Sequence, residues 1–289
     1  SEMCIRDRSN RTRSSPRQLP RPVVTMKPPL RSLLLAVPLL VLSSPAAAWC
    51  KHKGERDVVQ AAAGVTTVEV YARAGQLQIR GRSDATEVRA RGEACAARKD
   101  MLEVMGITLR ELPDRLQVLV EMPDISGETN PKWQDKLAVM DLWVEVPDTV
   151  NLIVHDSSGD LEVRQVASLE LTDSSGDIEI EAVAGDVLIP KDSSGDLELR
   201  DVGAVTIQVD SAGEIYVDTA DSVTIATDTS GDIRLYRIQG DVIVGTDSSG
   251  SIVVEDVGGR FIVENDTSGD IRYRGVAGAV SVPESRQGG

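Results

Sequence analysis

The side chains best able to do chemistry lie in a five-residue motif that recurs seven times between residues 156 and 270. Each copy opens on Asp, continues through small, mostly hydroxyl-bearing residues to Gly, and closes on an acidic residue in six of the seven copies. The copies are DSSGD at 156–160, 173–177 and 192–196, DSAGE at 210–214, DTSGD at 228–232 and 266–270, and DSSGS at 247–251. Carboxylates repeated in this way can ligate cations or transfer protons.

The closing acids are the candidate metal ligands of the sequence. They are Asp160, Asp177, Asp196, Glu214, Asp232 and Asp270, and Glu162, Glu179 and Glu198 lie beside the first three. Like charges about 4.8 Å apart repel by roughly 0.9 kcal/mol at the dielectric constant of water, so such a row must stay hydrated or recruit counter-ions. Calcium suits the row because it accepts roughly six to eight oxygens in flexible geometry.

Two features favour a solvated acidic face without metal. The repeat is twice as long as the nonapeptide of calcium-binding rolls and lacks the G-G-x-G-x-D pattern. Arg234 and Arg272 also enter the flank of the row, where they offset its charge. Both interpretations stay open, so the sequence requires no cofactor, and calcium is the candidate ion.

Catalysis has less support in the sequence. A hydrolase site needs carboxylates that converge on one pocket, whereas the acids here are spread evenly over the repeats. The two histidines, His52 and His155, are far apart, and no G-x-S-x-G, H-E-x-x-H or catalytically spaced Cys/His pair occurs. His155 is interpreted as a turn residue. We therefore predict that the protein is not an enzyme, with a cell-wall polysaccharide-active β-helix enzyme as the less favoured alternative.

The spacing of the motif indicates which elements position it. Successive copies are 17, 19, 18, 18, 19 and 19 residues apart, and a fixed period near 20 residues is typical of a solenoid. Within each repeat, apolar and often β-branched residues alternate with polar ones on both sides of a small turn, which predicts two short strands. Strands this short must stack coil upon coil, so the sequence predicts an all-β fold, a β-solenoid of about seven coils of 17–19 residues.

Four rows of inward-facing residues are predicted. The first strand contributes Leu161, Ile178, Leu197, Ile215, Ile233, Ile252 and Ile271, and two residues later Val163, Ile180, Leu199, Val217, Leu235, Val254 and Tyr273. The second strand contributes Leu169, Val187, Val205, Val223, Val242, Phe261 and Val280, and then Leu171, Ile189, Ile207, Ile225, Val244, Val263 and Val282. The motif forms the corner, where Gly159 and its equivalents take a positive φ. Its leading Asp and its hydroxyls are expected to bond N–H groups of the turn and groups of the neighbouring corners.

Residues 49–155 lack the motif but keep the alternation. Strands are predicted over 65–71, 76–80, 86–90, 107–109, 116–120 and 142–146, and turns at Gly75, Gly81, Pro113–Asp114 and Pro147–Asp148. A polar loop from Ser126 to Lys136 carries Trp133. We expect residues 49–155 to form an irregular β region that caps the solenoid of residues 156–283 and protects its open edge. Residues 284–289 are predicted to be a disordered tail.

The beginning of the chain reads as a leader followed by an export signal. Residues 1–25 are rich in Arg, Ser and Pro and are predicted to be spurious or disordered. Residues 26–48 have the order of a signal peptide, with Lys27 and Arg31, an apolar stretch from 33 to 42, and small residues at 46–48. This apolar stretch is too short to span a bilayer. The predicted mature chain begins at Trp49 and is exported, to the periplasm, the cell surface or the medium.

The predicted export bears on the pairing of the cysteines and on the net charge of the mature chain. Cys4 is lost with the leader, so Cys50 and Cys95 remain and are predicted to pair in an oxidising compartment. Two free buried thiols are the alternative. The whole chain of 289 residues has a net charge of −15, and residues 49–289 carry −21, of which −18 lies in residues 156–289. A chain this acidic is not expected to bind nucleic acid.

The DSSGD-type coils resemble the bacterial putative adhesin family, a β-solenoid domain of unknown function. The segments GVTTVEVYARAGQLQIRG (64–81) and DLWVEVPDTVNLIVHDSSGDL (141–161) carry the same resemblance, which covers most of residues 60–283. The resemblance implies an interaction protein of the cell surface or periplasm, and it transfers no catalytic residues. We therefore predict an exported, non-enzymatic adhesin or interaction scaffold at the cell envelope that binds a protein or glycan. A calcium-stabilised structural rod is the alternative.

Overall fold

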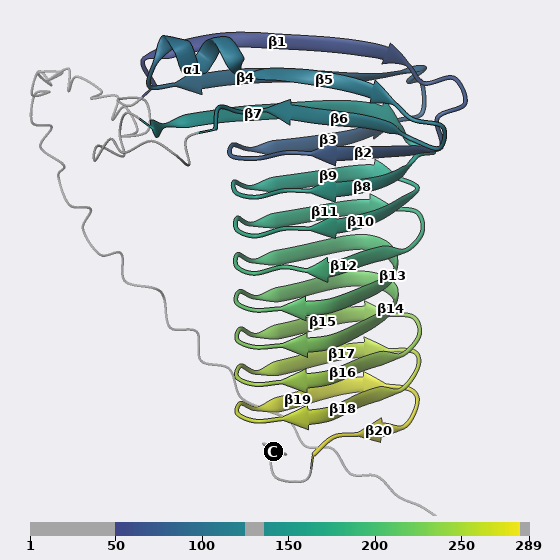
Figure 1. Cartoon of the computed structure of the whole chain (residues 1–289). Coiled ribbons are helices and arrows are strands. Elements are labelled where there is room, and N and C mark those ends of the chain that lie inside the picture. Colours follow the sequence, from purple (N-terminus) through teal and green to yellow (C-terminus); the bar gives the residue numbers. More distant parts are fainter. Residues whose placement is uncertain (1–49, 125–135, 284–289) are drawn as a thin grey trace, which may run out of the picture. The chain divides into compact units, whose positions relative to one another are not determined.

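The computed structural model describes residues 50–124 and 136–283, all of which lie in one compact unit, Ser43–Gly289. The predicted leader, signal peptide and tail lie outside the described residues, as does most of the predicted polar loop with Trp133. The described part contains twenty strands and one helix, α1 (Lys99–Val104) (Figure 1). None of its helical structure is long or apolar enough to cross a bilayer.

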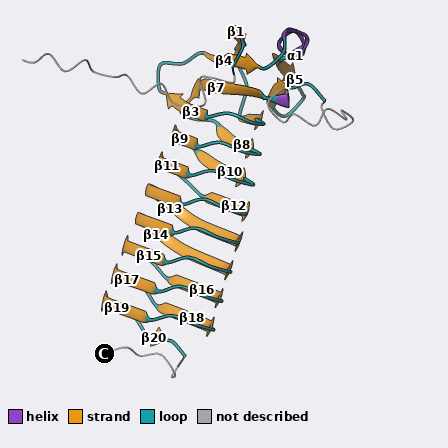
Figure 2. Cartoon of the chain, turned by 90° about the vertical axis from the view of Figure 1, so that its left-hand side faces the viewer, coloured by secondary structure: helices purple, strands orange, loops and turns teal. Residues whose placement is uncertain are grey.

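Seven coils stack on one another, as the repeat predicts, and each has two strand segments (Figures 1 and 2). The coils are β9 (Leu161–Val166) with β10 (Ser168–Thr172), β11 (Ile178–Val183) with β12 (Val187–Lys191), β13 (Leu197–Asp210), β14 (Ile215–Asp228), β15 (Ile233–Ile238) with β16 (Val242–Asp247), β17 (Ile252–Val257) with β18 (Phe261–Asp266), and β19 (Ile271–Val276) with β20 (Val280–Ser281). Equivalent residues pair in parallel register, so Ile178 lies between Leu161 and Leu197. Two parallel sheet faces result, one from the first strand segments and one from the second.

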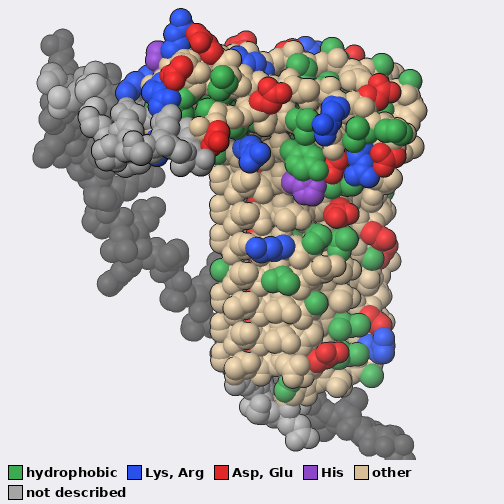
Figure 3. Space-filling model, viewed as in Figure 1, with side chains coloured by type: hydrophobic (Ala, Val, Ile, Leu, Met, Phe, Trp, Pro, Cys, Tyr) green, Lys and Arg blue, Asp and Glu red, His purple; other side chains and the backbone are tan. Residues whose placement is uncertain are grey.

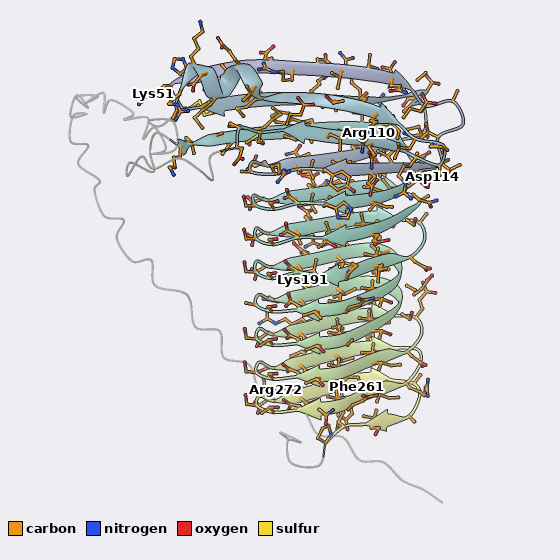
Figure 4. The ribbon with its side chains drawn as sticks, in the orientation of Figure 1. Lys51, Arg110, Asp114, Lys191, Phe261 and Arg272 are labelled. Carbon is orange, nitrogen blue, oxygen red and sulfur yellow. A yellow bond between two sulfur atoms is a disulfide. The ribbon has the colours of Figure 1, made fainter. Side chains whose placement is uncertain are left out.

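The predicted inward rows form the core. In the fourth coil, Ile215, Val217, Val223 and Ile225 are all fully buried. The prediction is wrong for Tyr273, which is 42% exposed because it lies in the last described coil, where no further described coil covers it. Its ring still contacts that of the buried Phe261, 5.7 Å away between centroids, and both last coils can be followed in Figure 4.

Each coil also has an opposite bend, between its two strand segments, whose conformation the sequence analysis did not identify. We define it by the residue of positive φ, which is Gln165, Ala182, Asp201, Thr219, Arg237, Asp256 or Gly275, with φ between 52° and 68°. In the first six coils the next residue is apolar and buried. The positive φ resets the alternation of the strand, so that two residues separated by three positions both face the core.

The stacking continues into the region before the first motif. Strands β2 (Thr67–Tyr71) and β3 (Leu77–Arg82) pair in parallel with β8 (Asn151–His155) and β9, and β6 (Leu116–Glu121) and β7 (Ala138–Pro147) pair in parallel with β2 and β3. Ala74 bridges to Ser158, and Gly75 has a φ of 132° like the motif glycines. An additional coil therefore exists whose corner has neither Asp nor Ser.

Antiparallel strands follow at the N-terminal end of the stack. Strand β4 (Glu87–Ala96) pairs with β7, β1 (His52–Ala61) pairs with β4, and β5 (Gly106–Glu111) pairs with β6. All six strands predicted in this region are present, whereas β1, β8 and α1 were not predicted. Two predictions are wrong: His155 lies in β8 rather than in a turn, and Gly81 lies in β3. A Cβ on Gly81 would lie 1.6 Å from the carbonyl oxygen of Gln165, so close approach of two backbones requires glycine there.

Candidate functional site

The seven motifs form one stacked column of turns, which we call the glycine corner. The motif glycines have φ between 118° and 139°. In the first six motifs the glycine N–H donates to a carbonyl oxygen of the next coil, as in Gly176 N to Ser194 O at 3.1 Å. A Cβ on Gly195 would lie 1.9 Å from the carbonyl oxygen of Gly176. The close packing of the corners therefore excludes every other residue type.

Hydroxyl groups link the corners along the stack, as predicted. The hydroxyl of the third motif residue donates to the carbonyl oxygen of the second motif residue in the preceding coil. These bonds join Ser175 to Ser157, Ser194 to Ser174, Ser230 to Ser211, Ser249 to Thr229 and Ser268 to Ser248, over 3.0–3.4 Å. The corners are thus cross-linked outside the strands, which holds the side chains at this edge in fixed positions.

The closing acids stack outside the corner in a row that we call the acidic ladder (Asp160, Asp177, Asp196, Glu214, Asp232 and Asp270). One oxygen of several ladder carboxylates accepts a backbone N–H from the next coil. Asp177 Oδ1 accepts Asp196 N at 3.0 Å, and Asp196 Oδ1 accepts Glu214 N at 2.9 Å. Asp232 Oδ1 likewise accepts Ser251 N at 2.9 Å. The ladder therefore has a structural role, and the second oxygen of each of these carboxylates remains outside this bond.

Arginines neutralise part of the acidic surface beside the ladder. Glu179 pairs in register with both Glu162 and Glu198, and Arg164 contacts Glu162 at 2.6 Å and Glu179 at 3.0 Å. Arg200 pairs with Glu198. The predicted offset by later arginines is also present, since Arg234 pairs with Glu214 and Asp232, and Arg272 with Asp270 at 2.6 Å (Figure 4).

The first three ladder residues line a groove of about 420 Å³, which we call the acidic groove. Its lining residues are Gln76, Leu77, Gln78, Asp160, Leu161, Glu162, Asp177, Ile178, Glu179, Asp196 and Glu198. A second hollow of about 190 Å³ continues along the same face and shares Asp196 and Glu198 with it. Within the described residues, Asp160, Asp177 and Asp196 form no ion pair. The groove therefore contains six carboxylates, three of which form no ion pair with a described residue.

The predicted calcium ligands do not converge on one point. In the part of the chain that the structure describes, no group of three or more His, Cys, Asp and Glu side chains is arranged to hold a metal ion. The ladder residues are instead distributed one per coil along the stack. Calcium binding by the ladder remains a prediction, and we assign no ligand set.

A second polar cluster, which the sequence analysis did not identify, surrounds Glu69 on β2. Glu69 is 6% exposed, and its carboxylate accepts hydrogen bonds from Gln117 Nε2 at 2.7 Å and Tyr71 Oη at 2.9 Å. Arg115 lies 3.4 Å and His155 Nε2 lies 3.5 Å from its oxygens, and the rings of Tyr71 and His155 stack at 4.6 Å. These contacts join β2, β6 and β8, where the coils meet the N-terminal strands.

Electrostatics agrees with a structural role for this cluster. Burial alone would raise the pKa of the Glu69 carboxyl, but the bonds from Gln117 and Tyr71 and the charge of Arg115 outweigh it and lower the pKa. The bond to Glu69 raises the pKa of the Tyr71 hydroxyl. Glu69 is therefore held as an anion whose oxygens are already bonded, an arrangement that stabilises a junction rather than transferring protons.

Cys50 and Cys95 form a disulfide in the structure, with their Cα atoms 5.5 Å apart. Cys95 lies in β4, opposite Lys53 of β1. The bond closes a loop across 45 residues of sequence. It ties the start of the described chain to the antiparallel strands at the N-terminal end.

Comparison with known protein families finds a match over the repeats. Residues 140–276 match the model of the family described as Toastrack, DUF4097, which covers most of the coils. The resemblance to an adhesin-like family of unknown function is thereby confirmed. No curated protein sequence matches the chain.

Several solved structures are similar over most of their length. A putative adhesin from Bacteroides fragilis is 14% identical, with 80% of this chain and 98% of that chain covered and a TM-score of 0.39. A putative lipid binding protein from Parabacteroides distasonis is 12% identical, with 81% and 98% covered and a TM-score of 0.40. A putative adhesin from Parabacteroides merdae is 10% identical, with 81% and 97% covered and a TM-score of 0.31.

Proposed function

We propose that this protein is an exported, non-enzymatic interaction scaffold at the cell envelope, adhesin-like in role, whose acidic groove binds a positively charged segment of a partner protein. The observation that carries the proposal is the groove itself. It presents six carboxylates on rigid, stacked strands, and Asp160, Asp177 and Asp196 have no ion pair among the described residues. Lysine or arginine side chains of a partner would supply the missing positive charge.

The two faces of the coils differ in charge, which supports recognition by one of them. On the face seen in Figure 3, formed by β8, β10, β12, β16 and β18 with the second halves of β13 and β14, charged side chains are sparse over the coils. An uncharged row runs along this face in parallel register: Leu188, Thr206, Thr224, Ile243 and Ile262. The acidic groove lies on the other face, so a cationic partner would be steered to that side.

The composition of the groove favours binding over catalysis. Acids, two glutamines and aliphatic side chains line it, and the glutamates among them are bonded to Arg164 and Arg200. A carboxylate that works as a general acid or base needs a partner of opposite function aimed at the same substrate atom. This groove instead repeats one type of side chain along a line, an arrangement suited to an extended cationic ligand.

Binding can be tested with the exported protein and a lysine-rich peptide by isothermal titration calorimetry. Replacing Asp177 and Asp196 by Asn removes two charges and keeps an oxygen that accepts the backbone N–H of the next coil. We expect this double variant to bind at least about tenfold more weakly, with an affinity that depends less steeply on salt. The matched control, Glu170→Gln with Glu264→Gln, removes two exposed charges from the other face and should keep the affinity. Equal weakening by both variants would show that only net charge matters and would refute the groove.

Export needs a separate test. Expression of the full chain in a bacterial host, followed by mass spectrometry of the envelope and medium fractions, should find a protein that begins at Trp49. A chain found only in the cytoplasm with residues 26–48 intact would contradict export. That result would leave the binding experiment unaffected.

A further inference from the structure

A second row of acids, separate from the acidic ladder, lies inside the glycine corner. The leading Asp of each motif from Asp156 to Asp247 is 0–6% exposed, although Asp is among the residues least often buried. We call this set the buried column. Its members are Asp156 (6%), Asp173 (1%), Asp192 (0%), Asp210 (1%), Asp228 (0%) and Asp247 (0%).

The register of the coils brings these carboxyl groups next to one another. Asp210 pairs with Asp228, Asp228 with Asp247, and Asp247 with Asp266. Adjacent positions in neighbouring coils are about 4.8 Å apart. Both carboxyl oxygens of Asp156, Asp173, Asp192, Asp210 and Asp228 lie out of contact with solvent and have no hydrogen-bond partner among the described residues.

The groups that face the column offer little compensation. The backbone N–H groups of one or both of the next two residues point toward each carboxyl, and one of them, Ser249 N, bonds Asp247 Oδ1 at 3.1 Å. Among the described residues, the side chains that act most strongly on the column are acids: the neighbouring column members, Asp266, and Asp232, which acts on Asp247. No Lys, Arg or His among the described residues compensates its charge.

A fully ionised column would therefore place a line of like charges out of contact with bulk solvent, with no described Lys, Arg or His to compensate them. Burial of this kind disfavours the charged form of a carboxyl group strongly, and a second carboxylate beside it adds repulsion. Burial, and after it the charges of neighbouring aspartates, raise the pKa of Asp156 to about 7 and those of Asp173, Asp192 and Asp247 to about 6. Protonation of some members removes the charge and allows a carboxylic O–H to donate to the next carboxylate.

We propose that the buried column is a proton-binding site, in which neighbouring carboxyl groups of successive coils share protons that the chain takes up when it folds. The proposal is independent of the function assigned to the acidic groove, because it concerns the buried leading Asp of each motif and not the acids that line the groove.

The sign of the resulting pH dependence follows from linkage. In the unfolded chain these groups ionise near the ordinary value of 3.8, whereas in the folded chain they keep protons up to about pH 6, and Asp156 up to about pH 7. Between these limits the folded state holds more protons, so stability falls as pH rises. Each such group changes the unfolding equilibrium constant by up to about tenfold per pH unit.

The first experiment is urea unfolding of the exported protein, with EDTA present, from pH 4.5 to 8. We expect the wild-type protein to become progressively less stable up to about pH 7 and to change little above it. Asp192→Asn combined with Asp210→Asn should reduce the slope by up to about a hundredfold per pH unit in the unfolding constant, because Asn stays neutral. The control Glu170→Gln with Glu264→Gln should keep the wild-type slope. Equal slopes in the wild-type protein and the Asn variant would overturn the proposal.

A second measurement needs no variant and applies even if the Asn protein does not fold. Infrared spectra of the folded wild-type protein distinguish the C=O stretch of a carboxylic acid from the bands of carboxylates. We expect a carboxylic-acid band at pH 5.5, where ordinary Asp is ionised, and its loss by pH 8. A folded protein with no such band at pH 5.5 would refute proton sharing. If stability then depended on the identity of the monovalent cation, bound cations would replace protons as the explanation.

Discussion

The glycine corner turns through one motif that recurs almost unchanged seven times, whereas the opposite bend takes Gln, Ala, Asp, Thr, Arg, Asp and Gly in successive coils. Both turns need a positive φ. At the glycine corner a Cβ would meet a carbonyl oxygen of the preceding coil at 1.5–2.0 Å. At the opposite bend most of these residues are exposed, so their side chains have room in solvent.

The difference shows what repetition in a sequence reports. A residue recurs at equivalent positions where backbones pack against each other or where its side chain bonds the next coil. A position that needs only an unusual φ tolerates many residue types at a cost of about 1–2 kcal/mol each. The buried column and the acidic ladder both lie at the glycine corner, and neither lies at the opposite bend.

The largest expected effect comes from removing the glycine at the close approach. Gly195→Ala adds a Cβ 1.9 Å from Gly176 O at a φ of 122°, so strain and overpacking act together. We expect a loss of about 3 kcal/mol or more in the free energy of unfolding. Chemical denaturation followed by circular dichroism measures it.

The matched control lies at the opposite bend. Gly275→Ala also places Ala at positive φ, 68°, but the nearest atom to its Cβ is a carboxylate oxygen of Asp256, which can move. We expect a loss of about 1 kcal/mol. Equal losses at the two glycines would show that φ alone, and not the contact between coils, selects glycine at the corner.

The predictability of the fold follows the same distinction. The spacing of the motif predicted the seven coils, their core rows and the stacked polar corner, because each depends on residues that repeat. The opposite bend escaped prediction because Ala182 or Arg237 gives no local sign of a positive φ. The coil at Gly75 escaped because its corner, RAG, has neither Asp nor Ser, and only the glycine marks it.

The candidate site was predictable in its residues and only partly in its roles. Placing the ladder acids on one edge required only the period. Their bonds to the backbone N–H of the next coil required the register and the direction of each side chain. The leading Asp was expected to bond N–H groups of its turn. Burial of a whole column of acids, with no described Lys, Arg or His to compensate it, is a property of stacking that no single repeat displays. The Glu69 cluster joins strands whose pairing the sequence does not reveal.

The next prediction compares the buried column with the acidic ladder at the same corner. Asp173 is 1% exposed, and burial, followed by the charge of Asp192, raises its pKa to about 6. Asp173→Asn should therefore stabilise the protein at pH 8, by on the order of 2 kcal/mol. The advantage should be small near pH 3, where the carboxyl is largely protonated in both states, and should grow until about pH 6. Urea denaturation at these pH values measures it.

Asp177→Asn, in the acidic ladder, is the control. Its amide oxygen can still accept the N–H of Asp196, and its charge is hydrated, so we expect a change within about 0.5 kcal/mol at both pH values. Stabilisation of similar size by both substitutions at pH 8 would mean that relief of general acidic repulsion, rather than burial, is responsible.

A smaller effect tests the opposite bend directly. Ala182 is exposed and has a φ of 58°. Ala182→Gly relieves the left-handed strain and adds flexibility to the unfolded chain, so we expect a net gain of about 0.5 kcal/mol. Ala184→Gly, two residues later, is exposed but has no positive φ. It should cost about 0.5–1 kcal/mol. A loss at both alanines would show that the bend is not strained, and thermal melts resolve the difference in sign.

The smallest expected effect concerns calcium at the acidic ladder. The ladder acids lie one per coil, and Asp177, Asp196 and Asp232 each use an oxygen for a backbone N–H, so an ion would meet few free oxygens from any one coil. Melts with 1 mM calcium and with EDTA should differ by less than about 0.5 kcal/mol, as for a dissociation constant of roughly 1 mM or weaker. A shift of several kcal/mol that Asp177→Asn with Asp196→Asn abolishes would instead establish specific sites. It would also place the metal sites at the glycine corner, because that variant changes acids of this corner only and leaves those of the opposite bend in place.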